Sequence, residues 1–218
     1  MAKTDDAYIP ALRFNWLTRF YDPLIGWTTR EKTFKSRLVQ QANLKPGHRV
    51  LDVGAGTGTL AILIKQQVPG AEVVALDGDP AILAIAAEKA RRHGVAIECK
   101  QGLSFALPFA DQSFDRCVSS LFFHHLTAAN KEKTLREIFR ILKPGGELHV
   151  ADWGRPTNGL MRVLFFGIQL LDGFETTSDN VKGRLPTFME KAGFQQVSVK
   201  DQIATPFGTM TLYYAAKP

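Results

Sequence analysis

Three glycines follow a short apolar segment near residue 50. Residues 50–59 read VLDVGAGTGT, so Gly54, Gly56 and Gly58 come directly after that segment. Glycine lets the main chain approach a ligand closely, and a glycine-rich turn between a strand and a helix is typical of cofactor sites. The spacing is Gly-x-Gly-x-Gly, whereas dinucleotide-binding proteins carry Gly-x-Gly-x-x-Gly. The turn alone therefore does not identify the cofactor.

A carboxylate stands 23 residues after Gly54. Asp77 closes the apolar segment 72–76, a position from which a carboxylate can accept hydrogen bonds from both hydroxyls of a ribose. The alternative is that Asp77 is a turn residue ahead of Gly78. Asp79 is expected to cap a helix that has Pro80 in its first turn. Together the glycine turn and Asp77 predict a site for a cofactor that contains ribose.

Two adjacent histidines follow the apolar segment 114–120. A histidine has an ordinary pKa near 6.5, so His124 or His125 could remove a proton from the hydroxyl or amine of an acceptor. The alternative is that both are loop or core histidines. Asp152 and Trp153, just past the segment 147–151, are similar candidates.

The elements that must position these residues alternate between strand and helix. Strands are expected at 49–53, 72–76, 96–100, 114–120, 147–151, 195–202 and 209–215. Helices are expected at 11–21, 30–42, 59–67, from 80 onward, and at 131–142, 158–171 and 184–191. This alternation predicts a mostly parallel sheet with helices on both faces and a ligand site beyond the first and fourth strands. The last two strands have no helix between them, which implies an antiparallel edge.

Length and composition favour one soluble globular domain. The chain has 218 residues, of which 45% are hydrophobic and 22% charged, and it shows no repeat or Gly/Pro/Ser-rich linker. Its amino terminus lacks a secretory apolar region, and the apolar stretch 160–171 is shorter than the roughly 20 residues that cross a bilayer. We therefore expect a cytoplasmic protein in which Cys99 and Cys117 form no disulfide and bind no metal.

Basic residues are concentrated near the amino terminus. The net charge is +6, and residues 1–50 hold nine Lys or Arg against four acidic residues. Such a bias attracts nucleic acid, anionic lipid or acidic substrates, but a solvated basic helix face is the simpler explanation. No stripe of alternating aromatic and basic residues is present to stack bases, so a small-molecule acceptor is favoured over nucleic acid. Peripheral contact between this basic face and a membrane stays open.

Four segments occur in a characteristic order. They are VLDVGAGTG (50–58), VVALDGDP (73–80), ALPFADQSFDRCVSSLFFHHL (106–126) and EIFRILKPGGELHVADW (137–153). Over about residues 20–216 the chain resembles the class I S-adenosylmethionine (SAM)-dependent methyltransferases, especially the branch of ubiquinone and menaquinone C-methyltransferases. The resemblance implies an α/β, Rossmann-like, doubly wound sheet of seven strands in the order 3-2-1-4-5-7-6, with strand 7 antiparallel. It also implies a single domain over 1–218, with an amino-terminal helical cap at 1–45 and a helical substrate cover at 155–192.

The resemblance also implies where SAM binds and S-adenosylhomocysteine (SAH) is released. The glycine turn would line the methionine and ribose portions of SAM, Asp77 would hold the ribose hydroxyls and Gly78 would border the adenine. Tyr21, followed by Asp22, resembles the aromatic-acid pair at which related enzymes fold a helix over SAM, although ordinary core packing is the alternative. The residues expected to line the cofactor are Tyr21, Asp52, Gly54, Ala55, Gly56, Gly58, Asp77, Gly78, Leu103, Ser104, Ser119 and Leu121.

One position departs from the family pattern. In QGLSFALPF (101–109) the family often has Asp where this chain has Leu103, and that acid receives the adenine amino group. The Leu103 side chain cannot accept a hydrogen bond. We therefore expect Ser104 or a main-chain carbonyl to contact the adenine.

The expected cover is apolar, which favours a hydrophobic or aromatic acceptor. Its apolar residues at helical spacing are Met161, Leu164, Phe165, Phe166 and Leu170. We predict in-line transfer of a methyl group from SAM to a small acceptor, without a metal. One alternative is a SAM-binding regulator or scaffold without turnover, for which Leu103 is the only hint. Another is an NAD(P)-dependent oxidoreductase, which the glycine spacing and the closing antiparallel strands disfavour.

Overall fold

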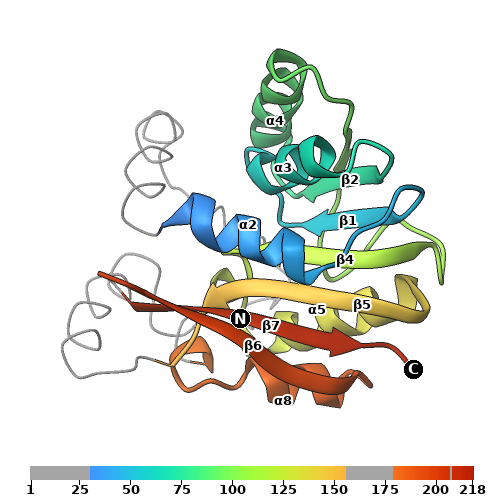
Figure 1. The fold of residues 1–218 in the computed structure, drawn as a ribbon. Helices are drawn as coiled ribbons and strands as arrows, with labels where there is room; N and C mark the ends of the chain where they lie inside the picture. The colour runs from blue at the N-terminus through green and yellow to red at the C-terminus, as the bar shows by residue number, and fades with distance from the viewer. Residues whose placement is uncertain (1–29, 156–178, 207) are drawn as a thin grey trace, which may run out of the picture.

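The computed structural model describes residues 30–155, 179–206 and 208–218, and its strands form one seven-stranded sheet in the order β3-β2-β1-β4-β5-β7-β6 (Figure 1). The strands are β1 Arg49–Val53, β2 Glu72–Asp77, β3 Glu98–Gln101, β4 Phe114–Ser120, β5 Leu142–Trp153, β6 Gln195–Thr205 and β7 Gly208–Ala216. The helices are α2 Glu31–Gln41, α3 Thr59–Gln67, α4 Pro80–Arg92, η1 Phe123–His125, α5 Ala128–Ile141 and α8 Leu185–Lys191.

Strand direction follows the predicted pattern. β1 pairs in parallel with β2 and β4, β2 with β3, and β4 with β5. β7 runs antiparallel to both β5 and β6. The predicted strand order and the antiparallel seventh strand are therefore confirmed. Because the carboxyl ends of β1, β2, β4 and β5 meet at one edge, the loops that follow them share that edge.

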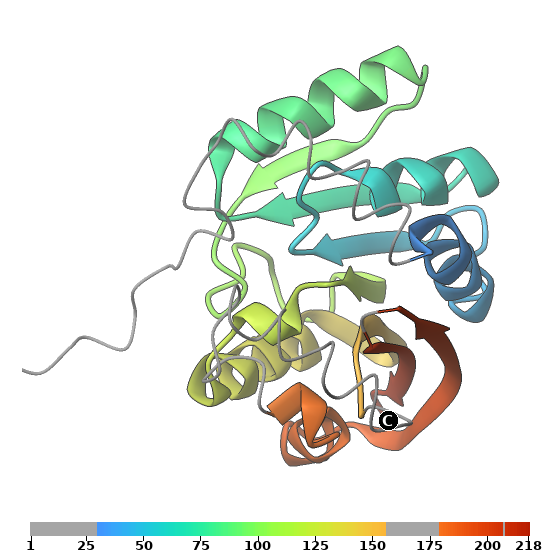
Figure 2. The same cartoon turned by 90° about the vertical axis from the view of Figure 1, so that its left-hand side faces the viewer.

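The sheet separates two apolar layers. Figure 2 shows α2 (blue) on one side of the strands and α5 (yellow-green) on the other. The layer beneath α2 and α3 includes Phe34, Leu38, Val50, Leu60, Ile64 and Val118. The layer beneath α5 and α8 includes Leu51, Leu135, Ile138, Leu148, Phe188 and Met189. Neighbouring residues of one strand enter opposite layers, as Val50 and Leu51 do. This burial on both faces explains why the parallel strands are continuous apolar runs in the sequence.

Two predicted starts are wrong by three residues or more, for identifiable reasons. α5 begins at Ala128, before the expected 131, because the Thr127 hydroxyl caps the helix by accepting a hydrogen bond from the Asn130 amide at 3.3 Å. β5 begins at Leu142, before the expected 147. The residues after it still turn at Gly145, but they pair with the end of the chain: the Gly145 amide donates to the Lys217 carbonyl, and the Lys217 amide donates to the Gly146 carbonyl.

Some expectations lie outside the described residues. They are the helix at 11–21, Tyr21, the basic face of the first 29 residues and the cover helix at 158–171. The division into a domain with a cap at 1–45 and a cover at 155–192 stays a prediction. None of the helices in the described ranges has the length and apolar character required to cross a bilayer.

Candidate functional site

The glycine turn has the left-handed backbone that glycine favours. The φ angles of Gly54 and Gly56 are 70° and 53°. A Cβ atom on Gly54 would collide with the Phe122 ring, whereas a Cβ on Gly56 would meet no atom of the described residues within 4 Å. Gly54 is therefore required by packing within the protein, and Gly56 faces space into which a ligand can fit.

Asp77 ties the glycine turn to the second strand. Its Oδ2 accepts from the Gly56 amide at 2.9 Å, and its Oδ1 accepts from the Asp79 amide at 3.1 Å. Burial raises the pKa of Asp77, and those two amides oppose the rise. Each carboxylate oxygen has two lone pairs, so Asp77 retains capacity to accept further hydrogen bonds. This geometry suits a ribose diol beside Gly56.

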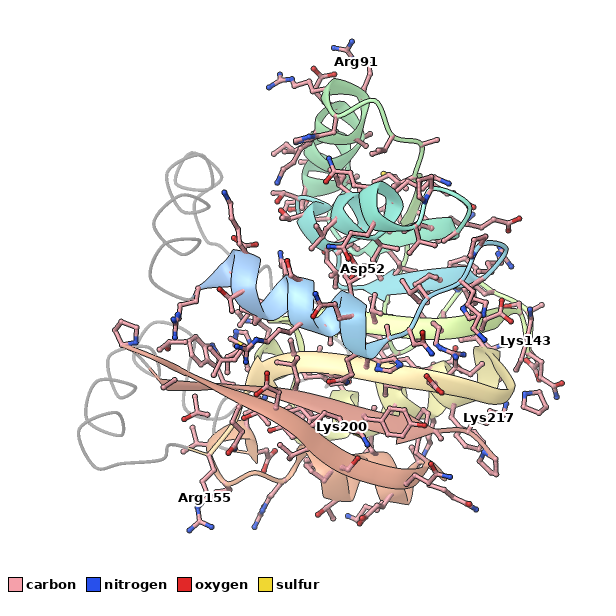
Figure 3. All side chains as sticks on the ribbon, in the orientation of Figure 1. Asp52, Arg91, Lys143, Arg155, Lys200 and Lys217 are labelled. Atoms are coloured by element: carbon pink, nitrogen blue, oxygen red, sulfur yellow. The ribbon has the colours of Figure 1, made fainter. Side chains whose placement is uncertain are left out.

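Asp52 is a buried carboxylate at the end of β1. Its exposed fraction is 1%, and neither oxygen has a hydrogen-bond partner with acceptable geometry among the described residues. Figure 3 places it inside the protein near α2 and α3. Burial raises the pKa of Asp52 to about 7, although Lys35 on α2 and the nearby Ala61 amide oppose this shift. Buried polar groups are almost always paired, so Asp52 has unmet capacity for a donor or a cation.

These three features fit SAM. The space at Gly56 admits a ligand against the main chain, Asp77 offers acceptors for ribose hydroxyls, and Asp52 lies directly before the turn with acceptors to spare. SAM carries a ribose, an ammonium group and a sulfonium cation. The donor set is therefore of the right chemical kind.

The residues expected near adenine are placed differently from one another. The Leu103 side chain is 37% exposed, whereas Ser104 is buried and its hydroxyl lies 2.9 Å from the Thr134 hydroxyl of α5. The Gly78 carbonyl accepts from the Gln101 side chain at 3.4 Å. The Ser104 hydroxyl is thus engaged within the protein. The adenine contacts of these residues stay predictions.

The next site residues join the ends of three strands. The Ser119 hydroxyl is buried and donates to the Val53 carbonyl at 2.8 Å. The Leu121 amide donates to the Ala151 carbonyl at 2.9 Å. These bonds hold the ends of β1, β4 and β5 together. Their predicted contact with the cofactor stays untested.

His124 forms a buried pair with Asp152. The His124 side chain is 5% exposed, and its Nδ1 lies 2.8 Å from Asp152 Oδ1. Asp152 is fully buried and also accepts from the Trp153 amide at 2.7 Å. Burial alone would raise the pKa of Asp152, but the His124 ring and these hydrogen bonds outweigh it and lower the pKa. A carboxylate at Nδ1 selects the tautomer in which Nε2 carries the lone pair that accepts a proton.

His125 packs against the same pair. The rings of His124 and His125 have centroids 4.0 Å apart. Burial, and then the neighbouring His124, lower the pKa of His125 to about 3. His125 is therefore neutral at physiological pH. Because Phe122 packs on Gly54, this histidine turn lies beside the glycine turn.

Sequence inspection missed two residues near the His124–Asp152 pair. Lys131 is fully buried, and its Nζ lies 3.8 Å from Asp179 Oδ2. A signal was available for Lys131, because it stands four residues before Leu135 on the buried stripe of α5. Asp179 had none, since nothing local distinguishes it from a surface acid.

Comparisons with known proteins give consistent results. A family model described as a methyltransferase domain matches residues 50–146. The chain is 34% identical over 203 residues to the demethylmenaquinone methyltransferase of Thermus thermophilus, covering 85% of this chain and 90% of that protein. It is 31% identical over 208 residues to the ubiquinone/menaquinone biosynthesis C-methyltransferase UbiE of Pseudomonas fluorescens, covering 86% of this chain and 79% of that protein.

A solved structure supports the fold. It is the phosphoethanolamine N-methyltransferase 2 of Haemonchus contortus in complex with phosphomonomethylethanolamine and SAH. The TM-score is 0.71 at 18% identity, and the match covers 85% of this chain and 52% of that one. This chain thus spans about half of that larger protein, and the two share the architecture of the sheet.

Proposed function

The chain belongs to the class I SAM-dependent methyltransferases of the quinone C-methyltransferase type, and we propose that its acceptor is a quinol-type aromatic molecule methylated at a ring carbon. The enzyme uses SAM as methyl donor and releases SAH. The proposal for the acceptor is supported by the names of the relatives, which act on demethylmenaquinone or in ubiquinone and menaquinone biosynthesis. We propose the cytoplasm as its location, where Cys99 and Cys117 would stay reduced.

On the donor side, the SAM-binding part of the site formed by residues 52–78, the protein binds and orients SAM. SAM supplies an electrophilic methyl group on a sulfonium. Asp77 would accept from the ribose hydroxyls while it holds the Gly56 amide, and Asp52 would face the ammonium group of the methionine portion. The glycine turn would hold SAM at the ends of β1 and β4. Its main contribution to the rate would be to align the methyl group with the acceptor.

On the acceptor side, we assign His124 as the general base. Removal of a proton from a phenolic hydroxyl raises the electron density at the neighbouring ring carbon, which is the nucleophile. After that carbon gains the methyl group, its hydrogen would return to the oxygen as a proton, which restores the aromatic ring. His124 would take that proton at Nε2, and Asp152, 2.8 Å from Nδ1, would stabilise the imidazolium that forms. The observation that carries this assignment is the burial of the His124–Asp152 pair beside the glycine turn.

The test is methyl transfer from labelled SAM to a demethylmenaquinol with a short side chain, kept reduced under anaerobic conditions. We expect turnover by the wild-type protein. His124→Gln should lower kcat by about 100-fold, the usual contribution of a general base, while the Kd for SAM changes by less than about threefold. The matched control is His93→Gln, because His93 is exposed at the end of α4 and should leave kcat unchanged.

Three outcomes would contradict parts of this assignment. Transfer to an oxygen or nitrogen acceptor, with none to the quinol, would make the proposed acceptor class wrong. A wild-type kcat in His124→Gln would make the base assignment wrong. SAM binding without methylation of any molecule in a cell extract would favour the regulatory or scaffold alternative.

A further inference from the structure

Lys131 occupies a position that is unfavourable for a cation. It lies near the amino-terminal end of α5, where the helix dipole repels positive charge, and the first turn of that helix contains no acidic residue. Its side chain is also fully buried, which lysine side chains rarely are unless paired. Burial lowers the pKa of Lys131, whereas Asp179 and Asp152 raise it. Among the described residues, those two carboxylates favour a cation at this place.

Asp179 connects Lys131 to the start of α8. Its Oδ2 is 3.8 Å from the Lys131 Nζ, and its Oδ1 is 3.4 Å from the Arg184 guanidinium at the start of α8. The next residue, Asn180, is fully buried and donates from its side chain to the Trp153 carbonyl at 3.3 Å. The segment around 179–180 is thus fixed to α5 and to the end of β5.

The segment that holds Lys131 also reaches the His124–Asp152 pair, because Asn180 donates to the carbonyl of Trp153, the residue next to Asp152. Asp152 and Lys131 attract one another, and Lys131 disfavours a second positive charge on His125. We propose that Lys131 is a positioning residue for methyl transfer: its buried cation, near both Asp179 and Asp152, sets the charge balance in which the His124–Asp152 pair takes up a proton. This inference rests on the proposed function, because it assumes that His124 is the base.

Within the part of the chain that the structure describes, the charged and titratable groups of the pair and around it come from five segments. They are His125 on η1, Lys131 on α5, Asp152 on β5, Asp179 with Arg184 before α8, and Tyr213 on β7. Tyr213 stays neutral, because burial and then Asp152 raise its pKa. Lys131 and Asp179 are therefore the charges whose removal should move the proton affinity of the pair in opposite directions.

The expected signs follow from electrostatics. Lys131→Met removes a positive charge, which favours the protonated imidazole, so the acid limb of the kcat/KM profile should move to higher pH by about one unit. Asp179→Asn removes a negative charge, so the limb should move to lower pH by a smaller amount. The double variant Lys131→Met/Asp179→Asn should move the limb less than Lys131→Met alone, since removing both charges of the pair leaves the local net charge unchanged.

The experiment measures kcat/KM against pH for these variants and for Lys133→Met, a matched control because Lys133 is exposed on the same helix. A merely structural role for Lys131 would lower stability and kcat without moving the limb. A second readout is an NMR titration of the His124 ring signals in the SAH-bound protein, identified by their loss in His124→Gln. This titration can be measured even for a folded variant whose turnover is too slow to assay.

The outcomes separate this inference from the proposed function. If the wild-type acid limb is unaffected by His124→Gln, the base assignment fails and this inference fails with it. The acid limb of the kcat/KM profile could report His124 and yet lie at the same pH in Lys131→Met, Asp179→Asn and the control Lys133→Met. In that case only the proposed role of Lys131 is wrong. A shift of the acid limb in the same direction in both single variants would also overturn the proposed role of Lys131.

Discussion

The proposed donor side and the proposed acceptor side of this site are formed by different kinds of group. The donor side uses residues 52–78, a nearly continuous stretch in which main-chain amides and glycines do most of the shaping. The acceptor side gathers buried ionisable side chains from segments far apart in the chain, namely His124, Lys131, Asp152 and Asp179. A shape made by the main chain tolerates little change, whereas a balance of side-chain charges can be adjusted without altering the fold. This contrast is consistent with one fold serving many acceptors.

The two sides also differ in how they neutralise buried charge. Burial and the neighbouring Asp77 disfavour ionisation of Asp52, whereas Lys35 on α2 and the Ala61 amide favour it. On the acceptor side, Asp152 and Asp179 each have a cationic or hydrogen-bonding partner within the protein. We infer that the donor side is left electrostatically incomplete for a cationic ligand, and that the acceptor side is complete before the acceptor binds.

The largest expected effect tests the rigidity of the glycine turn. Gly54→Ala should lower the free energy of unfolding by about 3 kcal/mol, because a left-handed backbone costs an alanine about 1–2 kcal/mol and its Cβ collides with Phe122. Gly56→Ala should lower it by only about 1 kcal/mol, yet weaken SAM binding about tenfold or more, since its Cβ enters the ligand space. Denaturant unfolding and calorimetry with SAM measure the two quantities.

Gly47→Ala is the matched control for both glycine variants. Gly47 also has a positive φ, 84°, and a Cβ there meets no described atom within 4 Å, but it lies in the turn before β1. It should lose about 1 kcal/mol of stability and no SAM affinity. Equal losses of SAM affinity in Gly47→Ala and Gly56→Ala would show that Gly56 has no special place beside the ligand.

A smaller effect tests whether the donor side is electrostatically incomplete. Burial raises the pKa of Asp52 to about 7 from its ordinary value of 3.8. The folded protein then binds a proton more tightly than the unfolded chain, so the associated stability is present below the ordinary pKa and is lost as pH rises through about 7. Asp52→Asn should therefore raise the free energy of unfolding by about 2 kcal/mol at about pH 8 and by much less at about pH 5.

The same substitution should reduce SAM affinity, because the amide lacks the negative charge that would face an ammonium group. Chemical denaturation at the two pH values and calorimetry with SAM give the two readouts. The control is Asp79→Asn, which retains a good helix cap at the neighbouring end of β2 and should change neither quantity appreciably. Destabilisation by Asp52→Asn at the higher pH would mean that Asp52 is satisfied within the protein.

The contrast between the two sides also explains what the sequence could predict. Most strands and helices could be predicted from local signals such as apolar runs and glycine turns, whereas the strand order was implied by the family resemblance. The start of α5 was wrong because the Thr127 cap was overlooked, and the start of β5 was wrong because it depends on pairing with distant residues. Residues for the donor side could be predicted for the same reason: Gly56 and Asp77 belong to a turn and a strand end that are recognisable on their own.

The acceptor side could not be predicted in full, because its chemistry depends on which ionisable side chains pair in the folded protein. His124 and Asp152 were both candidates, but nothing in the sequence links two residues 28 positions apart. The pairing of Lys131 with Asp179 needs α5 and the segment before α8 to converge, which only the packed structure decides. A buried charge becomes interpretable only when its counter-charge is known.

The smallest expected effect concerns Leu103, the one donor-side position that departs from the family pattern. Its side chain is 37% exposed and sits in a tight turn, in which the Ala106 amide donates to the Leu103 carbonyl at 3.1 Å. If main-chain groups already serve the adenine, Leu103→Asp should change the Kd for SAM by less than about threefold, since an exposed hydrogen bond contributes little beyond what water provides. Calorimetry with SAM, and with SAH as a second ligand, measures this. A tenfold or larger gain in affinity for both SAM and SAH would mean that the adenine contact is missing in this chain. Main-chain groups on the donor side would then contact the ribose but not the adenine.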